Sequence, residues 1–362
     1  MKKPEKLTSP RVWRTYIGGR LIEELHGLPE GVDGQFPEEW ILSVVHAKNV
    51  GREHILDEGL CRIADTGEFL RDRIAADPEV LLGKDHFEKV GATPGVLVKI
   101  IDSAERLTIQ AHPDKQRAME LFGSPFGKTE CWHILGGRSI DGEDPCIYVG
   151  FQTGITREYW KQVFDRQDIP AMLGCLHRFP VKAGETYLIP GGVPHAIGAG
   201  CLLVEIQEPT DYTVRTERVS PKGLKIKDQQ CHQGLGFEKM FDCFSYRGLT
   251  EAEAKEAFFV EPKLVETFPR GSRWEVIGAE RTTCFRMERC EFRGDWELPG
   301  ASVMSGLYIL EGKGKLYCGD MAQTFQPGEQ FFLPAGCERS CLCADDGEKV
   351  VLVRCFGPCV SQ

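Results

Sequence analysis

A short internal repeat constrains the fold of this chain more than any other feature of the sequence. The segment 183–192, AGETYLIPGG, recurs as segment 327–336, PGEQFFLPAG. In each copy a Gly-Glu turn leads into a short apolar run, and a Pro-containing turn then reverses the chain across a sheet. The recurrence of a whole turn–strand–turn unit indicates two similar β modules. The sequence therefore predicts a mainly β protein built from two jelly-roll modules.

The two copies differ in the residues that follow them. The first continues as Val-Pro-His195 and the second as Cys-Glu-Arg339, so a potential metal-binding histidine follows only the first copy. The two modules resemble the cupin fold. We expect residues 1–240 to form a catalytic, metal-binding cupin module and residues 241–362 a C-terminal cupin-like module that lacks metal ligands.

Helical periodicity is confined to a few segments among the short β-like runs. It occurs at residues 112–122, at residues 157–176 and after Thr250, which forms a possible capping box with Glu253. We expect these helices to be insertions packed on the β scaffold.

Net charge and hydropathy argue against nucleic acids and membranes as binding partners. The net charge of −10 and the absence of a Lys/Arg block argue against nucleic-acid binding. The apolar stretch 196–204 is about half of the roughly 20 residues that a membrane-spanning helix needs. The first residues contain lysines but no apolar run behind them, unlike a secretory signal. We therefore expect a cytoplasmic protein without a membrane or nucleic-acid partner.

The cysteines do not indicate a disulfide framework. There are 15 of them, an odd number, and none forms a C-x-x-C pair. We expect most of them to be reduced and buried.

Four residues have the chemistry and placement of a metal site. Alternation along a strand puts Gln110 and His112 on one face, Glu130 follows eighteen residues later, and His195 follows the turn of the first repeat copy. Two imidazoles, a carboxylate and an amide oxygen would bind zinc or a similar divalent ion and leave a position for substrate.

The segments around these residues resemble type I mannose-6-phosphate isomerases in order and approximate spacing. The matching segments are 97–100 (LVKI), 110–114 (QAHPD), 127–132 (GKTECW) and 189–197 (IPGGVPHAI), followed by Glu205 and Arg215. The resemblance extends to segments 13–19 and 38–40. It thus covers most of residues 10–220, and the C-terminal module more loosely.

This resemblance implies one zinc ion per chain, held by Gln110, His112, Glu130 and His195, although other divalent transition metals suit the same ligands. It also implies that Arg215 is a catalytic arginine. Aldose–ketose isomerisation passes through an enediol(ate), whose negative charge a fixed cation stabilises.

The reaction also needs a base. The acidic candidates are Glu205 and Asp211, and we rank Glu205 first. Either carboxylate could instead orient Arg215.

A phosphorylated sugar needs further contacts. For its phosphate group the resemblance implies Lys99, Lys128 and Lys222 as substrate-binding residues. Thr108 is a further candidate, standing where a serine is usual in the family. The segment 215–222 is one residue longer than expected in the longer members.

The interpretation as mannose-6-phosphate isomerase has two alternatives. One is a cupin isomerase that acts on another sugar, whether phosphorylated or unphosphorylated. The other is a non-haem metal oxygenase, because two histidines and a carboxylate also form the iron site of those enzymes, and fold alone does not separate the two. Lys128 and Arg215 favour the isomerase. The sequence leaves the oligomeric state open.

Overall fold

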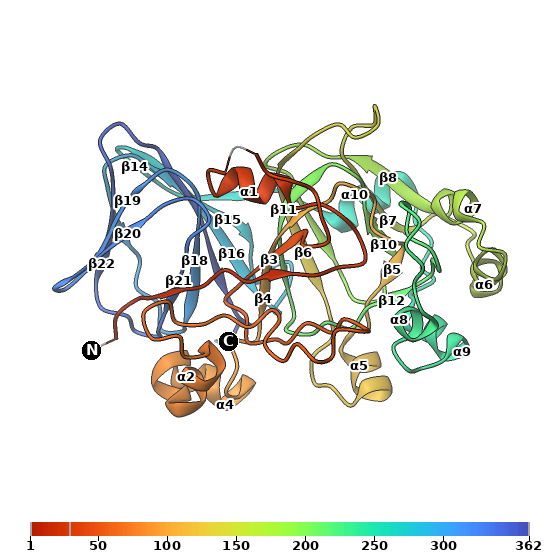
Figure 1. The fold of residues 1–362 in the computed structure, drawn as a ribbon, viewed down its shortest axis with the longest axis horizontal. Helices are drawn as coiled ribbons and strands as arrows, with labels where there is room; N and C mark the ends of the chain where they lie inside the picture. Colours follow the sequence, from red (N-terminus) through yellow and green to blue (C-terminus); the bar gives the residue numbers. More distant parts are fainter. Residues whose placement is uncertain (1, 29, 361–362) are drawn as a thin grey trace.

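The computed structural model describes residues 2–28 and 30–360, and it contains two β modules that lie side by side (Figure 1). Each module consists of two antiparallel sheets packed face to face, as a jelly roll requires. The expected mainly β fold is therefore confirmed.

The first module contains the catalytic candidates. Its larger sheet contains, in spatial order, β13 (Phe259–Val260), β9 (Thr186–Ile189), β6 (Glu130–Gly137), β11 (Cys201–Gln207), β4 (Leu97–Asp102), β3 (Glu38–Ile41) and β2 (Arg11–Val12). Its smaller sheet contains β12 (Val214–Arg215), β5 (Gln110–Ala111), β10 (His195–Ile197), β7 (Cys146–Phe151) and β8 (Leu176–Pro180).

The second module repeats this arrangement. Its larger sheet contains β1 (Glu5–Leu7), β21 (Gln330–Leu333), β18 (Ser305–Glu311), β23 (Val350–Phe356), β16 (Arg286–Phe292), β15 (Gly271–Ile277) and β14 (Lys263–Phe268). Its smaller sheet contains β17 (Asp295–Leu298), β22 (Ser340–Ala344), β19 (Gly314–Cys318) and β20 (Met321–Phe325).

The sequence repeat forms equivalent strands, β9 and β21. Each lies next to the outermost strand of its larger sheet, and that outermost strand is distant in sequence. β13, which follows residue 240 in the sequence, pairs with β9 in the first module. β1, which lies in the N-terminal segment, pairs with β21 in the second module. By strand pairing, the chain passes from the first module to the second between Val260 and Lys263. The boundary expected near residue 240 remains a prediction.

The helices lie outside the sheets, as Figure 1 shows. They are α1 (Arg20–Leu25), α2 (Leu70–Ala76), α3 (Pro78–Leu82), α4 (Lys84–Val90), α5 (Lys115–Phe122), α6 (Arg157–Asp165), α7 (Ile169–Gly174), α8 (Asp228–His232), α9 (Phe237–Met240) and α10 (Glu251–Phe258), with a 3-10 turn at Phe241–Cys243. No helix within residues 2–28 and 30–360 is both long and apolar enough to cross a membrane.

Helix boundaries follow local capping. The capping box predicted at Thr250 is present, with the Thr250 side chain accepting a hydrogen bond from the Glu253 amide. The helix expected over 157–176 is divided into α6 and α7. Gln167 adopts a φ of 50° after α6, and Asp168 caps α7 by accepting from the Ala171 amide.

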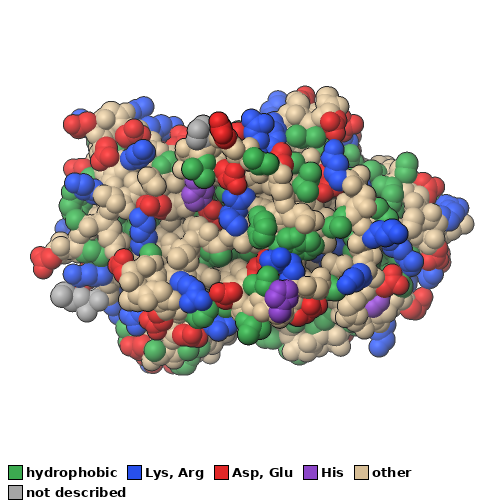
Figure 2. All heavy atoms as spheres, viewed as in Figure 1, with side chains coloured by type: hydrophobic (Ala, Val, Ile, Leu, Met, Phe, Trp, Pro, Cys, Tyr) green, Lys and Arg blue, Asp and Glu red, His purple; other side chains and the backbone are tan. Residues whose placement is uncertain are grey.

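The two modules share a buried core. The outer faces of their larger sheets pack together through apolar side chains such as Ile100 and Val204 from the first module and Tyr308 and Val353 from the second. Sheets buried on both faces are rich in apolar residues on both sides, as in the run 97–101. At the surface, basic and acidic side chains are interspersed over both modules (Figure 2).

Candidate metal centre and active site

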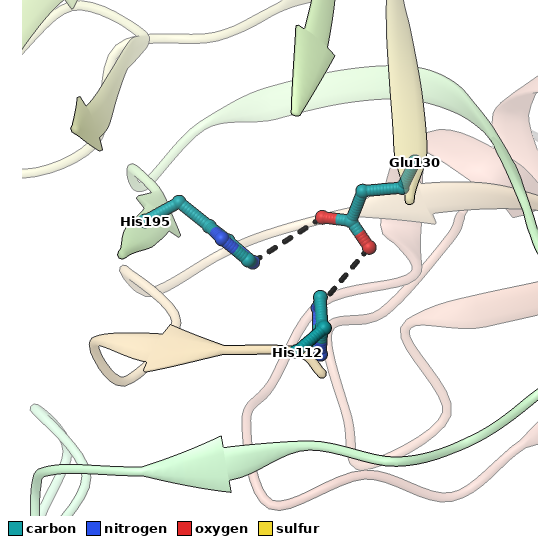
Figure 3. Close-up of side chains that lie close together, drawn as sticks. All are labelled: His112, Glu130 and His195. Atoms are coloured by element: carbon teal, nitrogen blue, oxygen red, sulfur yellow. Dashed lines mark ion pairs between the residues drawn. The ribbon is translucent and has the colours of Figure 1, made fainter. Parts of the chain in front are cut away.

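Three side chains from three strands of the first module converge on one point (Figure 3). His112 follows β5, and Glu130 and His195 begin β6 and β10. The Nε2 atoms of His112 and His195 lie 3.1 and 3.2 Å from the two carboxylate oxygens of Glu130. All three side chains are buried, and their potential ligand atoms lie within 4.8 Å of one another.

Backbone carbonyls set the orientation of both imidazoles. His112 Nδ1 lies 2.8 Å from the Tyr212 carbonyl oxygen, and His195 Nδ1 lies 2.9 Å from that of Val193. Because a carbonyl oxygen only accepts, each Nδ1 carries the proton and each Nε2 presents a lone pair to the cluster. Burial, reinforced by the Lys128 charge, lowers the pKa of His112 to about 3, and burial also lowers the pKa of His195. Both imidazoles are therefore neutral, the form that binds metals.

Glu130 is a buried carboxylate in an environment that favours a bound cation. Burial alone would raise its pKa, but the Lys128 charge holds the pKa well below the usual range. Its Oε1 atom has no hydrogen-bond donor among the described residues although it is buried. An ionised oxygen facing imidazole lone pairs is unfavourable unless a cation lies between them. Two nitrogens and one oxygen suit zinc or a similar divalent ion.

Two further residues border this cluster. The Gln110 side-chain amide lies 3.3 Å from His195 Nε2, because β5 and β10 pair with Gln110 opposite His195. The Lys128 ammonium lies 2.8 Å from His112 Nε2 and 3.0 Å from Glu130 Oε2. The structure thus brings Gln110 to the expected ligands, and it places Lys128 against the ligands themselves.

A small inner cavity of about 40 Å³ adjoins the cluster. Seven of the residues expected to contact substrate or metal line its walls: Lys99, Thr108, Gln110, Lys128, Glu205, Asp211 and Arg215. These residues span more than a hundred positions of sequence, so the cavity exists only in the folded module.

The two candidate bases differ in their environment. Glu205 Oε1 accepts from the Lys99 ammonium at 2.8 Å, and Oε2 accepts from Trp132 Nε1 at 3.1 Å. Burial and the nearby Glu130 charge raise the pKa of Glu205. Asp211 lies 3.4 Å from Arg14, and although burial opposes the change, the charges of Arg14 and Lys99 lower its pKa. Glu205 is therefore the more basic carboxylate of the two.

Arg215 occupies the strand beside the metal-binding strand. β12 pairs with β5 so that Arg215 lies opposite Gln110. Its guanidinium donates to the carbonyl oxygens of Gln230 at 2.9 Å and Thr213 at 3.4 Å. Among the described residues no carboxylate lies within 4.0 Å of it, so its charge is available to a substrate.

The sequence and the fold of this chain were compared with those of known proteins. No family model matches the chain. A mannose-6-phosphate isomerase of Streptococcus mutans is 26% identical over 335 residues, which span 92% of this chain and 93% of that protein. The chain is thus similar over most of its length to a mannose-6-phosphate isomerase.

Solved structures share the fold of this chain. The crystal structure of the mannose 6-phosphate isomerase from Bacillus subtilis superposes with a TM-score of 0.75 at 21% identity and covers 98% of this chain and 100% of that one. A mannose 6-phosphate isomerase solved with bound zinc and yttrium gives a TM-score of 0.70 at 16% identity and covers 99% and 100% of the two chains.

One residue expected to bind substrate lies outside both cavities of the site. The Lys222 ammonium is half exposed, pairs with Asp141 at 3.3 Å and lines neither the inner cavity nor the outer cavity described below. The turn at 220–223 directs it away from the site, because the Lys222 amide donates to the buried Glu105 carboxylate.

Two charged residues at the site were not singled out from the sequence. Arg14 and Glu38 are buried and paired at 2.9 Å, and both line the inner cavity. Glu38 also accepts from the Tyr16 hydroxyl and from Trp40 Nε1, each at 2.8 Å. The segments 13–19 and 38–40 carried the family resemblance, but no spacing pattern links an arginine to a glutamate on a strand 24 positions later.

A larger outer cavity of about 580 Å³ opens beside the inner one. Arg14, Thr15 and Arg215 line both. The remaining walls come from the segment after β3, from Phe122 and Tyr212, and from α8 with Gln233. The shared residues place Arg215 between the inner cavity and the outer one.

Proposed function

We propose that this chain is a zinc-dependent isomerase that interconverts mannose 6-phosphate and fructose 6-phosphate. One observation supports the proposal above all. A neutral cluster of two histidines and a carboxylate adjoins a cavity whose walls include a glutamate held by a lysine and an arginine without a carboxylate partner in the described part of the chain. This is the set of groups that an enediol(ate) mechanism needs, and the similarity to mannose-6-phosphate isomerases supports it.

His112, Glu130 and His195 would hold the metal, with Gln110 as the fourth ligand. A bound zinc ion would supply a Lewis acid that polarises the substrate oxygens at C1 and C2. The mannose 6-phosphate isomerase solved with zinc and yttrium, which shares the fold of this chain, supports that choice of metal.

Glu205 is the proposed base. In the direction from aldose to ketose its carboxylate removes the proton from C2, the C1 carbonyl becomes the enediolate oxygen, and the proton returns to C1. A second proton passes from the oxygen at C2 to the oxygen at C1. Lys99 and Trp132 fix the two carboxylate oxygens, so Glu205 stays in place between the two transfers.

Arg215 is the proposed stabiliser of the enediolate. Its guanidinium is held by two backbone carbonyls and borders the inner cavity, so it is already oriented before charge develops. Asp211, bonded to Arg14, is better placed to hold the site together than to accept a proton.

The similarity to mannose-6-phosphate isomerases in sequence and fold favours this activity over the alternatives of a non-haem oxygenase or an isomerase of another sugar. A cytoplasmic location, the absence of nucleic-acid and membrane partners and the division of the chain into a catalytic and a structural module remain predictions.

The proposal is tested by an enzyme-linked assay that follows fructose 6-phosphate formed from mannose 6-phosphate. The protein is assayed as purified, after chelation, and after zinc is restored. Chelator-sensitive turnover that zinc restores is expected. Absence of turnover by protein with zinc demonstrably bound would contradict the proposal and direct attention to unphosphorylated sugars.

A further inference from the structure

The charges around the site leave few cations free to bind a phosphate group. Lys99 is paired with Glu205 at 2.8 Å, Lys128 with Glu130 at 3.0 Å, and Arg14 with Glu38 at 2.9 Å. A buried ammonium that already neutralises a carboxylate gains little from a second anion, and its removal exposes the partner's charge. These three cations neutralise carboxylates inside the site.

Lys48 differs from these cations. It lies in the segment between β3 and α2, on the wall of the outer cavity. Its ammonium stands over the Tyr212 ring, 4.7 Å from the centroid, and no carboxylate of a described residue lies within 4.0 Å of it. Its side chain is exposed on the cavity side, so a ligand reaches it without displacing an ion pair.

The backbone fixes where this lysine stands. The Lys48 amide donates to Asp211 Oδ2 at 3.0 Å, and the Ala47 amide donates to the Glu58 carbonyl at 3.0 Å. The Tyr212 ring beneath the ammonium is itself stacked on Phe122 at 4.4 Å. The ammonium is thus anchored to the same Asp211–Tyr212 segment that leads into the catalytic strand β12.

Size and charge both favour the outer cavity for the phosphate end of the substrate. The inner cavity, of about 40 Å³, has room only for the reacting end of a sugar, whereas the outer one measures about 580 Å³. The outer walls carry two cations without a carboxylate partner among the described residues, Lys48 and Arg215, and a single carboxylate, Glu53, which accepts from the Gly51 amide. A dianion is therefore attracted there.

We propose that Lys48 binds the phosphate group of the substrate in the outer cavity, beside Arg215, and so determines the preference for phosphorylated over free sugar. This inference rests on the proposed isomerase activity. It assigns the phosphate contact to a residue of the segment after β3 in place of Lys99, Lys128 and Lys222. The C1–C2 end of the sugar then lies in the inner cavity, and Arg215 lies between the two ends.

The test compares Lys48→Met with wild type and with Lys48→Arg. Loss of one charge-assisted contact is expected to raise the KM for mannose 6-phosphate by about 10- to 100-fold, with kcat changed by no more than about twofold. Lys48→Arg retains a cation and is expected to recover most of the affinity. The control is Lys161→Met, which removes an equivalent charge on α6 where Lys161 pairs with Asp165.

Inorganic phosphate provides a second readout that needs no turnover. Wild type is expected to bind phosphate, measured by calorimetry, and Lys48→Met is expected to bind it at least about tenfold more weakly. An unchanged KM together with unchanged phosphate binding in Lys48→Met would overturn the assignment and leave the isomerase proposal intact. If wild type lacks turnover, the isomerase proposal fails, and the phosphate titration still decides whether Lys48 binds an anion.

Discussion

The Lys99 ammonium donates a hydrogen bond of 2.8 Å to Glu205 Oε1, and both side chains are buried. The pair comes from neighbouring strands, because β4 and β11 align with Lys99 opposite Glu205. A base held in this way keeps its position while it carries the substrate proton, which a two-step transfer between adjacent carbons requires.

Glu205→Gln tests the base. The amide keeps the shape of the side chain but accepts no proton, so we expect kcat to fall by at least about 100-fold. The direct measurement is exchange of the C2 proton of mannose 6-phosphate with deuterated solvent, followed by NMR. Asp211→Asn is the matched comparison, and exchange that persists in Glu205→Gln but stops in Asp211→Asn would transfer the role of base to Asp211.

Metal binding and charge stabilisation are separable by mutation. We expect Arg215→Ala to retain one zinc ion per chain while kcat falls by about 100- to 1,000-fold, because an electrostatic contact to the transition state is lost. His195→Ala is expected to lose the zinc ion as well. Metal content by mass spectrometry and kcat on the same samples check both outcomes; full turnover of Arg215→Ala would refute the role given to this arginine.

The buried carboxylate of Glu38 makes stability depend on acid pH. Burial alone would raise its pKa, but the charges of Arg14 and Lys99 and the hydrogen bonds from Trp40 and Tyr16 lower it to about 2 from an ordinary value of 4.5. A group whose folded pKa is lowered stabilises the fold above the unfolded pKa and loses that contribution as pH falls to the folded value.

We therefore expect the free energy of unfolding to contain a Glu38 contribution that disappears between about pH 4.5 and 2. Glu38→Gln removes this contribution, so its unfolding free energy is expected to fall less steeply over the same window. Urea denaturation at a series of pH values measures both curves. Parallel curves for the two proteins would contradict the prediction.

Tyr308 links the two modules. Its hydroxyl donates at 2.6 Å to Glu39 Oε1, a buried oxygen of the first module, while His26 lies 2.7 Å from the other oxygen. We expect Tyr308→Phe to cost about 1.5–3 kcal/mol, because a hydrogen bond to a buried charge is lost. Tyr317→Phe is the control, since Tyr317 is 39% exposed on the second module. Equal melting temperatures of the two variants would disprove this role.

The sequence predicts those parts of the site that lie within continuous segments. The repeat marks β9 and β21, and alternation places Gln110 beside His112, because both patterns follow from local backbone geometry. The break between α6 and α7 was missed because the apolar period continues across Gln167, whose positive φ is a backbone property that the period does not report.

The positions of the site lysines and of Arg14 depend on tertiary packing. Lys99, Lys128 and Lys222 are alike as residues, yet two neutralise buried carboxylates and the third pairs with Asp141 at the surface. Arg14 pairs at the site with Glu38 and with Asp211, which is 197 positions away in the sequence. Such pairings depend on long-range packing and leave no spacing in the sequence.

The exchange of β1 and β13 between the modules has a consequence for cutting the chain. An excision near residue 240 would take β13 away from the catalytic sheet, and removal of the N-terminal residues would strip β1 from the other sheet and expose the hydrogen-bonding edge of β21. Because each cut would leave one sheet without an edge strand, the two modules are expected to melt in one transition.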